Sequence, residues 1–247
     1  RHDAQAVYFP SCVSRVLGAL PGEPAEPSVM AAFVALADRA GSPVTIPGDV
    51  AGTCCGVAFA SKGYDDAHRF AANRAIERLW RWSDAGRLPV VIDTTPCTYA
   101  LSTCRGQLSA ENQRRFDGLH IMDAITFVHD QLLSRLIIAR GRESVVVHPV
   151  CSVTKLGLGR QLETVVQAAS RRVTVPTTAG CCGFAGDRGF LFPELTETAT
   201  HEEAVEVRAG DHDGYVASSR TCEIGLTRAT SRLYRSFIHL LEEASRV

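Results

Sequence analysis

The chain has 247 residues, a formal net charge of −1 and 45% hydrophobic residues, a composition typical of a globular protein with one or two domains. The balanced charge argues against nucleic-acid binding, because proteins that bind a phosphate backbone carry an excess of basic residues. The longest apolar run, Val29 to Ala37, has nine residues, whereas a membrane-spanning helix needs about twenty.

Three short apolar runs predict strands in the first part of the chain, at 4–9, 44–46 and 89–93. They are rich in β-branched residues and lack strict alternation, as is typical of buried parallel strands. Before the third run, a set of apolar residues has the spacing of a buried helix face: Ala72, Ala75, Ile76, Leu79 and Trp80.

The second part of the chain shows the same alternation. Strands are predicted at 145–147, 173–175 and 215–217, and a helix at 196–207 with Pro193 near its start. A C-terminal helix is predicted from residues that share one face: Leu233, Phe237, Leu240, Leu241 and Ala244. Strands that alternate with helices indicate an α/β fold of βαβ units with parallel sheets.

The nine cysteines form two similar sets and one remainder. The first set is Cys12, Cys54, Cys55 and Cys97, the second is Cys151, Cys181, Cys182 and Cys222, and Cys104 is left over. Each adjacent pair is followed by glycine, with 42 and 30 residues before the pairs and 42 and 40 after them. An odd number of thiols with adjacent pairs, in a chain of this size, indicates a reducing compartment and metal or redox chemistry.

We therefore predict two βαβ repeats related by a pseudo-twofold axis, covering 1–139 and 140–247 and joined near 136–143. Loops that follow parallel strands gather at one edge of a sheet. Every cysteine of the two sets follows a predicted strand, so each repeat should gather four thiols at its strand C-terminal ends. Because the chain begins at Arg1 and not at methionine, we expect it to be a piece of a longer protein.

Four converging thiols suit a soft metal. Structural zinc commonly uses C-x2-C knuckles, and neither repeat has one. Adjacent cysteines more easily bind different irons of a larger cluster, which favours iron–sulfur, with zinc and buried free thiols as the alternatives. The predicted metal ligands are Cys12, Cys54, Cys55, Cys97, Cys151, Cys181, Cys182 and Cys222.

The second set has the more polar surroundings in the sequence. Gly183, Gly186 and Gly189 follow its cysteine pair, and glycine lets backbone amides approach an anion or a cluster. Its other polar neighbours are basic: Lys155, Arg188 and Arg220. The first set is followed instead by the apolar segment 57–59, so we expect the second set to be the more important one for electron transfer.

Two further residues have competing interpretations. His148, three residues before Cys151, is a candidate metal ligand or proton relay. Its counterpart in the first repeat is Tyr8 or Phe9, which favours a strand-end histidine with satisfied hydrogen bonds. Cys104 is placed seven residues after Cys97, on the same helix face, and is interpreted as a core cysteine in preference to an extra ligand.

The repeated Cys…Cys-Cys-Gly…Cys unit resembles the cysteine-rich CCG domain. That domain occurs twice in the cysteine-rich subunit of heterodisulfide reductase, in the glycolate oxidase iron–sulfur subunit, and in the iron–sulfur subunit of anaerobic glycerol-3-phosphate dehydrogenase. A narrower resemblance, to the C-terminal part of FAD-linked D-lactate dehydrogenases, rests on four segments. They are YFPSCVSR at 8–15, HPVCSVTKL at 148–156, GCCGFAGDRG at 180–189 and SSRTCEIG at 218–225.

This resemblance implies an electron-transfer domain with iron–sulfur clusters, [4Fe-4S] in type, that works with an FAD-binding oxidase domain or subunit. Electrons from a 2-hydroxy acid such as D-lactate would pass from the flavin through this region to a quinone or another acceptor. The implied location is the cytoplasm, with peripheral attachment to the inner face of the membrane as a second option. The isolated chain is not expected to oxidise the substrate.

The sequence departs from the heterodisulfide reductase pattern at one position in each repeat. That family doubles the last cysteine as C-x-x-C, which gives five ligands to a noncubane cluster. Ala100 and Gly225 stand at the extra positions here, so four thiols remain in each repeat. A four-thiolate cluster, a zinc-stabilised interaction module and a metal-free thiol–disulfide site in which the adjacent cysteines are the reactants all stay open.

Overall fold

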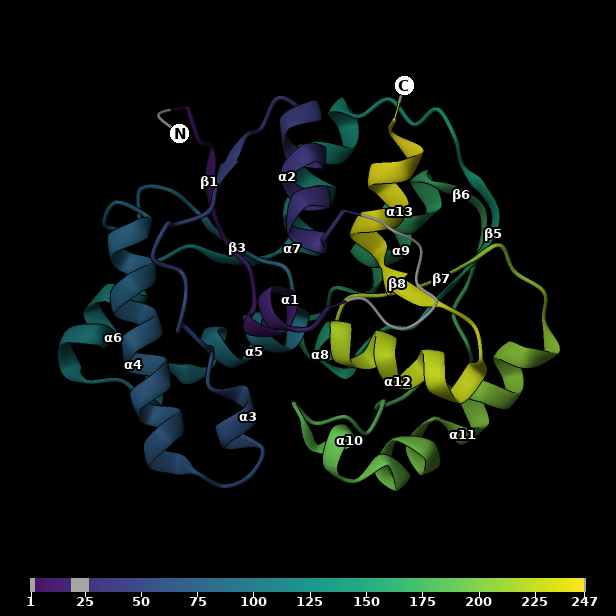
Figure 1. The fold of residues 1–247 in the computed structure, drawn as a ribbon. Coiled ribbons are helices and arrows are strands. Elements are labelled where there is room, and N and C mark those ends of the chain that lie inside the picture. Colours follow the sequence, from purple (N-terminus) through teal and green to yellow (C-terminus); the bar gives the residue numbers. More distant parts are fainter. Residues whose placement is uncertain (1–2, 19–26, 247) are drawn as a thin grey trace.

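The computed structural model describes residues 3–18 and 27–246, which form two four-stranded parallel sheets side by side (Figure 1). The first sheet has the order β2-β1-β3-β4 and the second β6-β5-β7-β8, so the same topology occurs twice. The strands are β1 (Ala6–Phe9), β2 (Val44–Thr45), β3 (Val90–Ile92), β4 (Ile121–Asp123), β5 (Arg142–Val147), β6 (Ser170–Thr174), β7 (Gly214–Ala217) and β8 (Tyr234–Ser236). The predicted fold of repeated α/β units with short parallel sheets is confirmed.

Helices connect the strands and cover both sheets (Figure 1). The first repeat contains α1 (Cys12–Val16), α2 (Val29–Arg39), α3 (Val57–Ala60), α4 (Asp65–Trp82), α5 (Thr95–Ser102), α6 (Ala110–Asp117) and α7 (Ala124–Phe127). The second contains α8 (Cys151–Leu156), α9 (Gly159–Ala168), α10 (Arg188–Leu191), α11 (Pro193–Ala209), α12 (Arg220–Thr230) and α13 (Phe237–Ala244). None of the helices within 3–18 and 27–246 combines the length and apolar character that crossing a bilayer requires.

All six predicted strands are present, and the structure adds an edge strand to each sheet. The predicted C-terminal helix is wrong at its start, because Leu233 precedes strand β8 and the helix begins only at Phe237. The Ser236 side chain accepts a hydrogen bond from the backbone N–H of Ile238 and so caps that helix. Arg142, expected in the polar join, is already part of β5.

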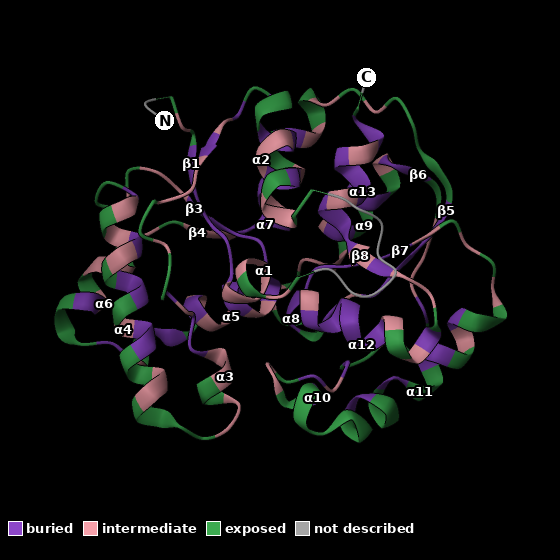
Figure 2. Cartoon of the chain, viewed as in Figure 1, coloured by how far each residue is buried: buried purple, intermediate pink, exposed green. Residues whose placement is uncertain are grey.

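The two sheets share one apolar core. Buried residues of α2 and α7 in the first repeat form a single cluster with residues of α9 and α13 in the second. In Figure 2 the inward faces of α2 and α13 are buried where the two helices lie side by side. A smaller cluster lies wholly in the first repeat, between its sheet and α4, and includes Cys55, Cys97 and Cys104. The repeats are therefore held together by burial and not by a linker alone.

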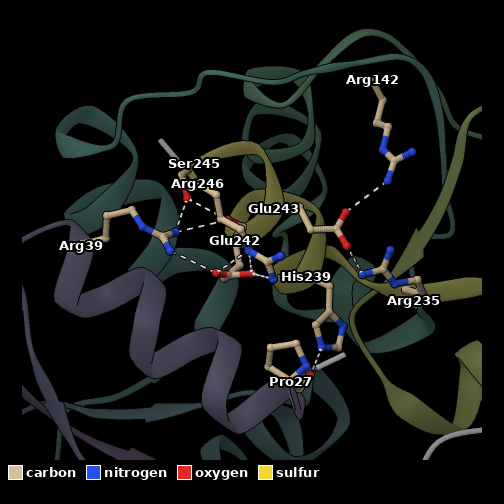
Figure 3. A network of polar contacts seen from close by, with 9 residues as sticks. All are labelled: Pro27, Arg39, Arg142, Arg235, His239, Glu242, Glu243, Ser245 and Arg246. Atoms are coloured by element: carbon tan, nitrogen blue, oxygen red, sulfur yellow. Dashed lines mark hydrogen bonds and ion pairs between the residues drawn. The ribbon is translucent and has the colours of Figure 1, made fainter. Parts of the chain in front are cut away.

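Polar contacts at the C-terminal helix reinforce this joint (Figure 3). Arg39 of α2 donates hydrogen bonds to Ser245 Oγ at 2.6 Å and to Glu242 Oε1 at 3.0 Å. Burial alone would raise the pKa of Glu242, but hydrogen bonds and charges from Arg246 and Arg39 outweigh it and lower the pKa. Glu242 is thus a charged anchor between the repeats.

Candidate metal centres

The first thiol set lies where three strands of the first sheet end. Cys12 begins α1, directly after β1, and the Ser11 side chain caps that helix. Cys54 and Cys55 occupy the loop after β2, which turns at Gly56 with a φ of +84°. Cys97 lies in the first turn of α5, after β3.

The four sulfurs of this set form two close contacts. Cys12 Sγ lies 4.0 Å from Cys54 Sγ, and Cys55 Sγ lies 3.0 Å from Cys97 Sγ. Hydrogen bonds from the thiols of Cys12 and Cys55, together with the Gly56 N–H and the charge of Arg15, lower the pKa of Cys54 to about 2 despite its burial. The set therefore stabilises a thiolate even without a metal.

The second set occupies the equivalent places of the second sheet. Cys151 begins α8 after β5, and Cys222 lies in the first turn of α12 after β7. Cys181 and Cys182 follow β6 in a loop that turns at Gly183, with a φ of +71°. The predicted correspondence of the two cysteine sets is therefore visible in the order of the elements.

The second set also forms two sulfur contacts. Cys182 Sγ lies 2.6 Å from Cys222 Sγ. A hydrogen bond from Cys151, the N–H of Gly183 and the charges of His148 and Lys155 lower the pKa of Cys181 to about 5 in spite of desolvation. Both sets thus contain an inner pair of sulfurs and an outer pair with one stabilised thiolate.

The donor atoms match a soft metal centre by chemistry, but their spacing does not match a single ion. Two thiolates of a tetrahedral zinc site lie about 3.8 Å apart, whereas the inner pairs are separated by 3.0 and 2.6 Å. Across the described ranges, no three His, Cys, Asp or Glu side chains form a group that could hold a metal ion. Any metal centre requires the inner pairs to open, and four thiolates are the ligand set that iron–sulfur clusters and zinc prefer.

The family is indicated by two Cys-Cys-Gly turns, each placed after the second strand of an α/β repeat. The family model of the cysteine-rich domain CCG matches residues 6–102 and again residues 145–227. The chain belongs to the CCG cysteine-rich domain family. It is also 23% identical, over 251 aligned positions, to the glycolate oxidase iron–sulfur subunit of Escherichia coli (strain K12). The alignment covers 99% of this chain and 59% of that relative, so the chain spans less than two thirds of the relative's length.

The three glycines that follow the second cysteine pair make different contacts. The Gly183 N–H donates to Cys181 Sγ at 3.4 Å, and the Gly56 N–H of the first repeat contacts Cys54 Sγ at the same distance. Gly186, with a φ of +81°, lies against Ala58 of the first repeat. The Gly189 N–H instead donates to the Phe184 carbonyl within the loop. Of the three, only Gly183 is seen to direct its amide at sulfur.

The basic residues around the CCG thiols are distributed differently from the sequence expectation. Lys155 lies over the Tyr99 ring, 5.0 Å from its centroid, and its charge acts on Cys151 and Cys181. Arg220 turns away, to the Gly18 carbonyl and Glu223. Arg15 of the first repeat was not expected at the site, yet its guanidinium donates to backbone carbonyls around the Cys54 loop. Positive charge is therefore present at both sets.

Cys104 is buried in the small core cluster of the first repeat, and its thiol donates to the Leu101 carbonyl at 3.2 Å. Helix α5 ends at Ser102, so the expectation that Cys97 and Cys104 share one continuous helix is wrong. Burial raises the pKa of the Cys104 thiol to about 11, which fits a core cysteine.

Gly225, which stands where the heterodisulfide reductase pattern has a fifth cysteine, is closely surrounded in the second repeat. A Cβ atom at Gly225 would lie 2.9 Å from Thr196 Cγ2 and 3.3 Å from Phe184 Cδ2. Both neighbours are buried: Thr196 belongs to α11, and Phe184 lies in the loop before α10. A cysteine side chain therefore has no room there without displacing that packing.

Proposed function

We propose that the chain is an electron-transfer module in which each repeat, 1–139 and 140–247, holds one iron–sulfur cluster. The observation that carries the proposal is the duplicated set of four thiols at equivalent strand ends of a CCG-family fold. Similarity to a protein named as an iron–sulfur subunit supports the same cofactor. The cluster, of the [4Fe-4S] type, would supply one-electron redox chemistry.

The residues around the thiols would hold the cluster and adjust its charge. The ligands would be the two sets Cys12, Cys54, Cys55, Cys97 and Cys151, Cys181, Cys182, Cys222. The amides of Gly56 and Gly183 already donate to sulfur, and such hydrogen bonds stabilise the more negative, reduced state of a cluster. Arg15 and Lys155 add positive charge with the same effect.

At the level of the whole enzyme, we propose that this module receives electrons from an FAD-binding oxidase domain or subunit that oxidises a 2-hydroxy acid of the D-lactate or glycolate type. The module would then reduce a quinone or another acceptor. The oxidation itself belongs to the flavin-bearing part.

Anaerobic purification followed by iron, sulfide and zinc assays tests the cofactor assignment. We expect iron and acid-labile sulfide at two clusters per chain. The Cys181→Ser, Cys182→Ser double variant should lose half of the iron and keep the rest, because each repeat has a complete ligand set. Stoichiometric zinc without sulfide would contradict the proposal and identify a zinc-stabilised interaction module instead.

A metal-free thiol–disulfide site is the second candidate, favoured by the 2.6 Å contact between the sulfurs of Cys182 and Cys222. In that reaction the two thiols would reduce a disulfide substrate to two thiols and become a Cys182–Cys222 disulfide. The adjacent cysteines 181 and 182 would not pair with one another, because their sulfurs contact Cys151 and Cys222 respectively. Stoichiometric reduction of a glutathione disulfide by the iron-free chain, lost in Cys222→Ser, would support this candidate.

A further inference from the structure

The cysteine loop of the first repeat is held by an arginine of the helix that begins at Cys12. Arg15 lies in α1 and is half-buried. Its Nε donates to the Pro10 carbonyl at 3.1 Å, and its two Nη atoms donate to the carbonyls of Val50, at 3.1 Å, and Thr53. A guanidinium carries five N–H donors in one rigid plane, so a single side chain can fix three carbonyls at once.

Two of these carbonyls flank the outer sulfur pair of the first set. Pro10 precedes Cys12 by two residues, and Thr53 directly precedes Cys54. The sulfurs of the two cysteines lie 4.0 Å apart. The guanidinium therefore joins the two chain segments that carry this pair, and its positive charge lies against the peptide bond that links Thr53 to Cys54.

A second guanidinium binds the same loop from α4. Arg78 Nη1 donates to the carbonyls of Asp49, at 3.2 Å, and Ala51, at 2.9 Å. It also donates to the Thr53 hydroxyl. Arg78 thus holds the loop to α4, whereas Arg15 holds it to the segment that begins α1.

The second repeat holds its cysteine loop with the opposite charge. Thr154 stands in α8 where α1 has Arg15, since each is three residues after the cysteine that begins its helix. The loop before the second cysteine pair is bound instead by Glu206 of α11, which accepts from the N–H groups of Thr177 at 2.8 Å and Thr178 at 3.1 Å. The two loops are therefore fixed by different chemistry.

The first set also has less contact with water than the second. Cys12 and Cys54 are half-buried, whereas Cys151 and Cys181 are exposed. Water stabilises the negative charge that a cluster gains on reduction, and burial removes part of this stabilisation. A half-buried centre therefore requires a fixed positive group in place of water, and Arg15 is positioned to provide it.

We propose that Arg15 is a positioning residue of the first centre, which keeps Cys12 and Cys54 together and supplies the positive charge that stabilises the reduced cluster. The inference rests on the proposed cluster, because it assigns to Arg15 a role toward it. Reduction adds one electron, taken from an external donor, so removal of a nearby positive charge lowers the potential of the centre. The second centre, with Thr154 at the equivalent place, should not respond.

Redox titration of chains that keep a single centre tests the charge. Cys181→Ser, Cys182→Ser leaves the first centre, and Cys54→Ser, Cys55→Ser leaves the second. Both are titrated anaerobically with dithionite and followed by electron paramagnetic resonance. In the first background, Arg15→Gln should lower the equilibrium constant for reduction about tenfold, which is about 59 mV for one electron. Arg15→Lys keeps the charge and should restore most of this loss, and neither variant should shift the second centre.

Hydrogen–deuterium exchange on the iron-free full chain tests the positioning. The N–H groups of Val50 and Thr53 donate hydrogen bonds within the loop. They should exchange faster in both Arg15→Gln and Arg15→Lys, because neither side chain can hold three carbonyls. The control Arg87→Gln removes the same charge from an exposed pair with Asp84, before the start of β3, and should change neither measurement.

The outcomes separate this inference from the proposed function. A chain that binds no iron would overturn the proposed function, while the exchange measurement still decides whether Arg15 holds the loop. An unchanged potential of the first centre in Arg15→Gln, or an equal fall in Arg15→Lys, would overturn the role of the charge. Unchanged exchange would overturn the positioning. If Arg15→Gln cannot keep the first cluster, the loss supports the positioning, and a lowered potential in Arg15→Lys would still overturn the role of the charge.

Discussion

The two repeats position their thiols in the same way but expose them differently. In the first repeat Cys12 and Cys54 are half-buried, whereas in the second Cys151 and Cys181 are exposed. The second set is also followed by an exposed apolar stretch, with Phe190, Leu191 and Phe192 all on the surface. An electron donor or acceptor can approach the exposed outer thiols of the second set more closely than the half-buried ones of the first, so we expect the second set to exchange electrons with partners.

The largest effect on electron transfer should come from replacing one inner cysteine, and comparing this replacement between the two repeats. Cys182→Ser should abolish electron transfer to the acceptor in the complete enzyme while substrate still reduces the flavin. Cys55→Ser removes a thiol from the small core cluster and should mainly lower the melting temperature. Stopped-flow absorbance of flavin and acceptor, with thermal unfolding, measures both. The ranking of the two sets would be reversed if Cys55→Ser stopped electron transfer and Cys182→Ser did not.

The glycine of each Cys-Cys-Gly turn gives a matched test of the two loops. Both have positive φ, so alanine costs about 1 to 2 kcal/mol at either position. A Cβ at Gly183 would lie 2.6 Å from the Leu195 carbonyl oxygen, whereas at Gly56 the nearest atom is 2.8 Å away on the movable His68 side chain. Gly183→Ala should therefore lose about 3 kcal/mol or more, since overpacking adds to the strain. Urea unfolding showing equal losses would contradict this difference.

The helices that follow the fourth strands have different N-cap residues, Asp123 for α7 in the first repeat and Ser236 for α13 in the second. Burial raises the pKa of Asp123 to about 6, against hydrogen bonds from Ile125 and Thr98 that lower it. The folded chain thus binds this proton more tightly than the unfolded chain, and stability should rise as pH falls from about 6 to about 4, by roughly 2 kcal/mol. Asp123→Ser, which copies the second repeat, should remove this dependence. A slope that persists in the variant would assign it to other groups.

The smallest effect concerns the joint between the repeats. Glu242→Ala removes the acceptor shared by Arg39 and Arg246 and should cost about 1 to 2 kcal/mol in urea unfolding. The control Asp117→Asn breaks the exposed Arg105 pair within the first repeat and should leave stability unchanged. Equal effects of the two variants would show that the Glu242 contacts do not hold the repeats together.

The sequence was sufficient for the repeated α/β fold and for the grouping of the thiols, because apolar runs and cysteine spacing are local signals. Strands β4 and β8 give no such signal, because each contains polar residues and neither forms an apolar run. The His148–Glu203 pair joins residues 55 apart in sequence, and no periodicity reports such a contact. No sequence pattern indicates the role of Arg15, because it donates to backbone carbonyls, which every sequence has.

The continuous core also constrains how the chain folds during synthesis. Helix α2 emerges early from the ribosome, but the helix that covers its apolar face, α13, is made only after the whole second sheet. Until α13 has emerged, the first repeat exposes that face and is prone to aggregation or to binding by chaperones. The apolar face of α2 should therefore become buried only after the second repeat has been synthesised.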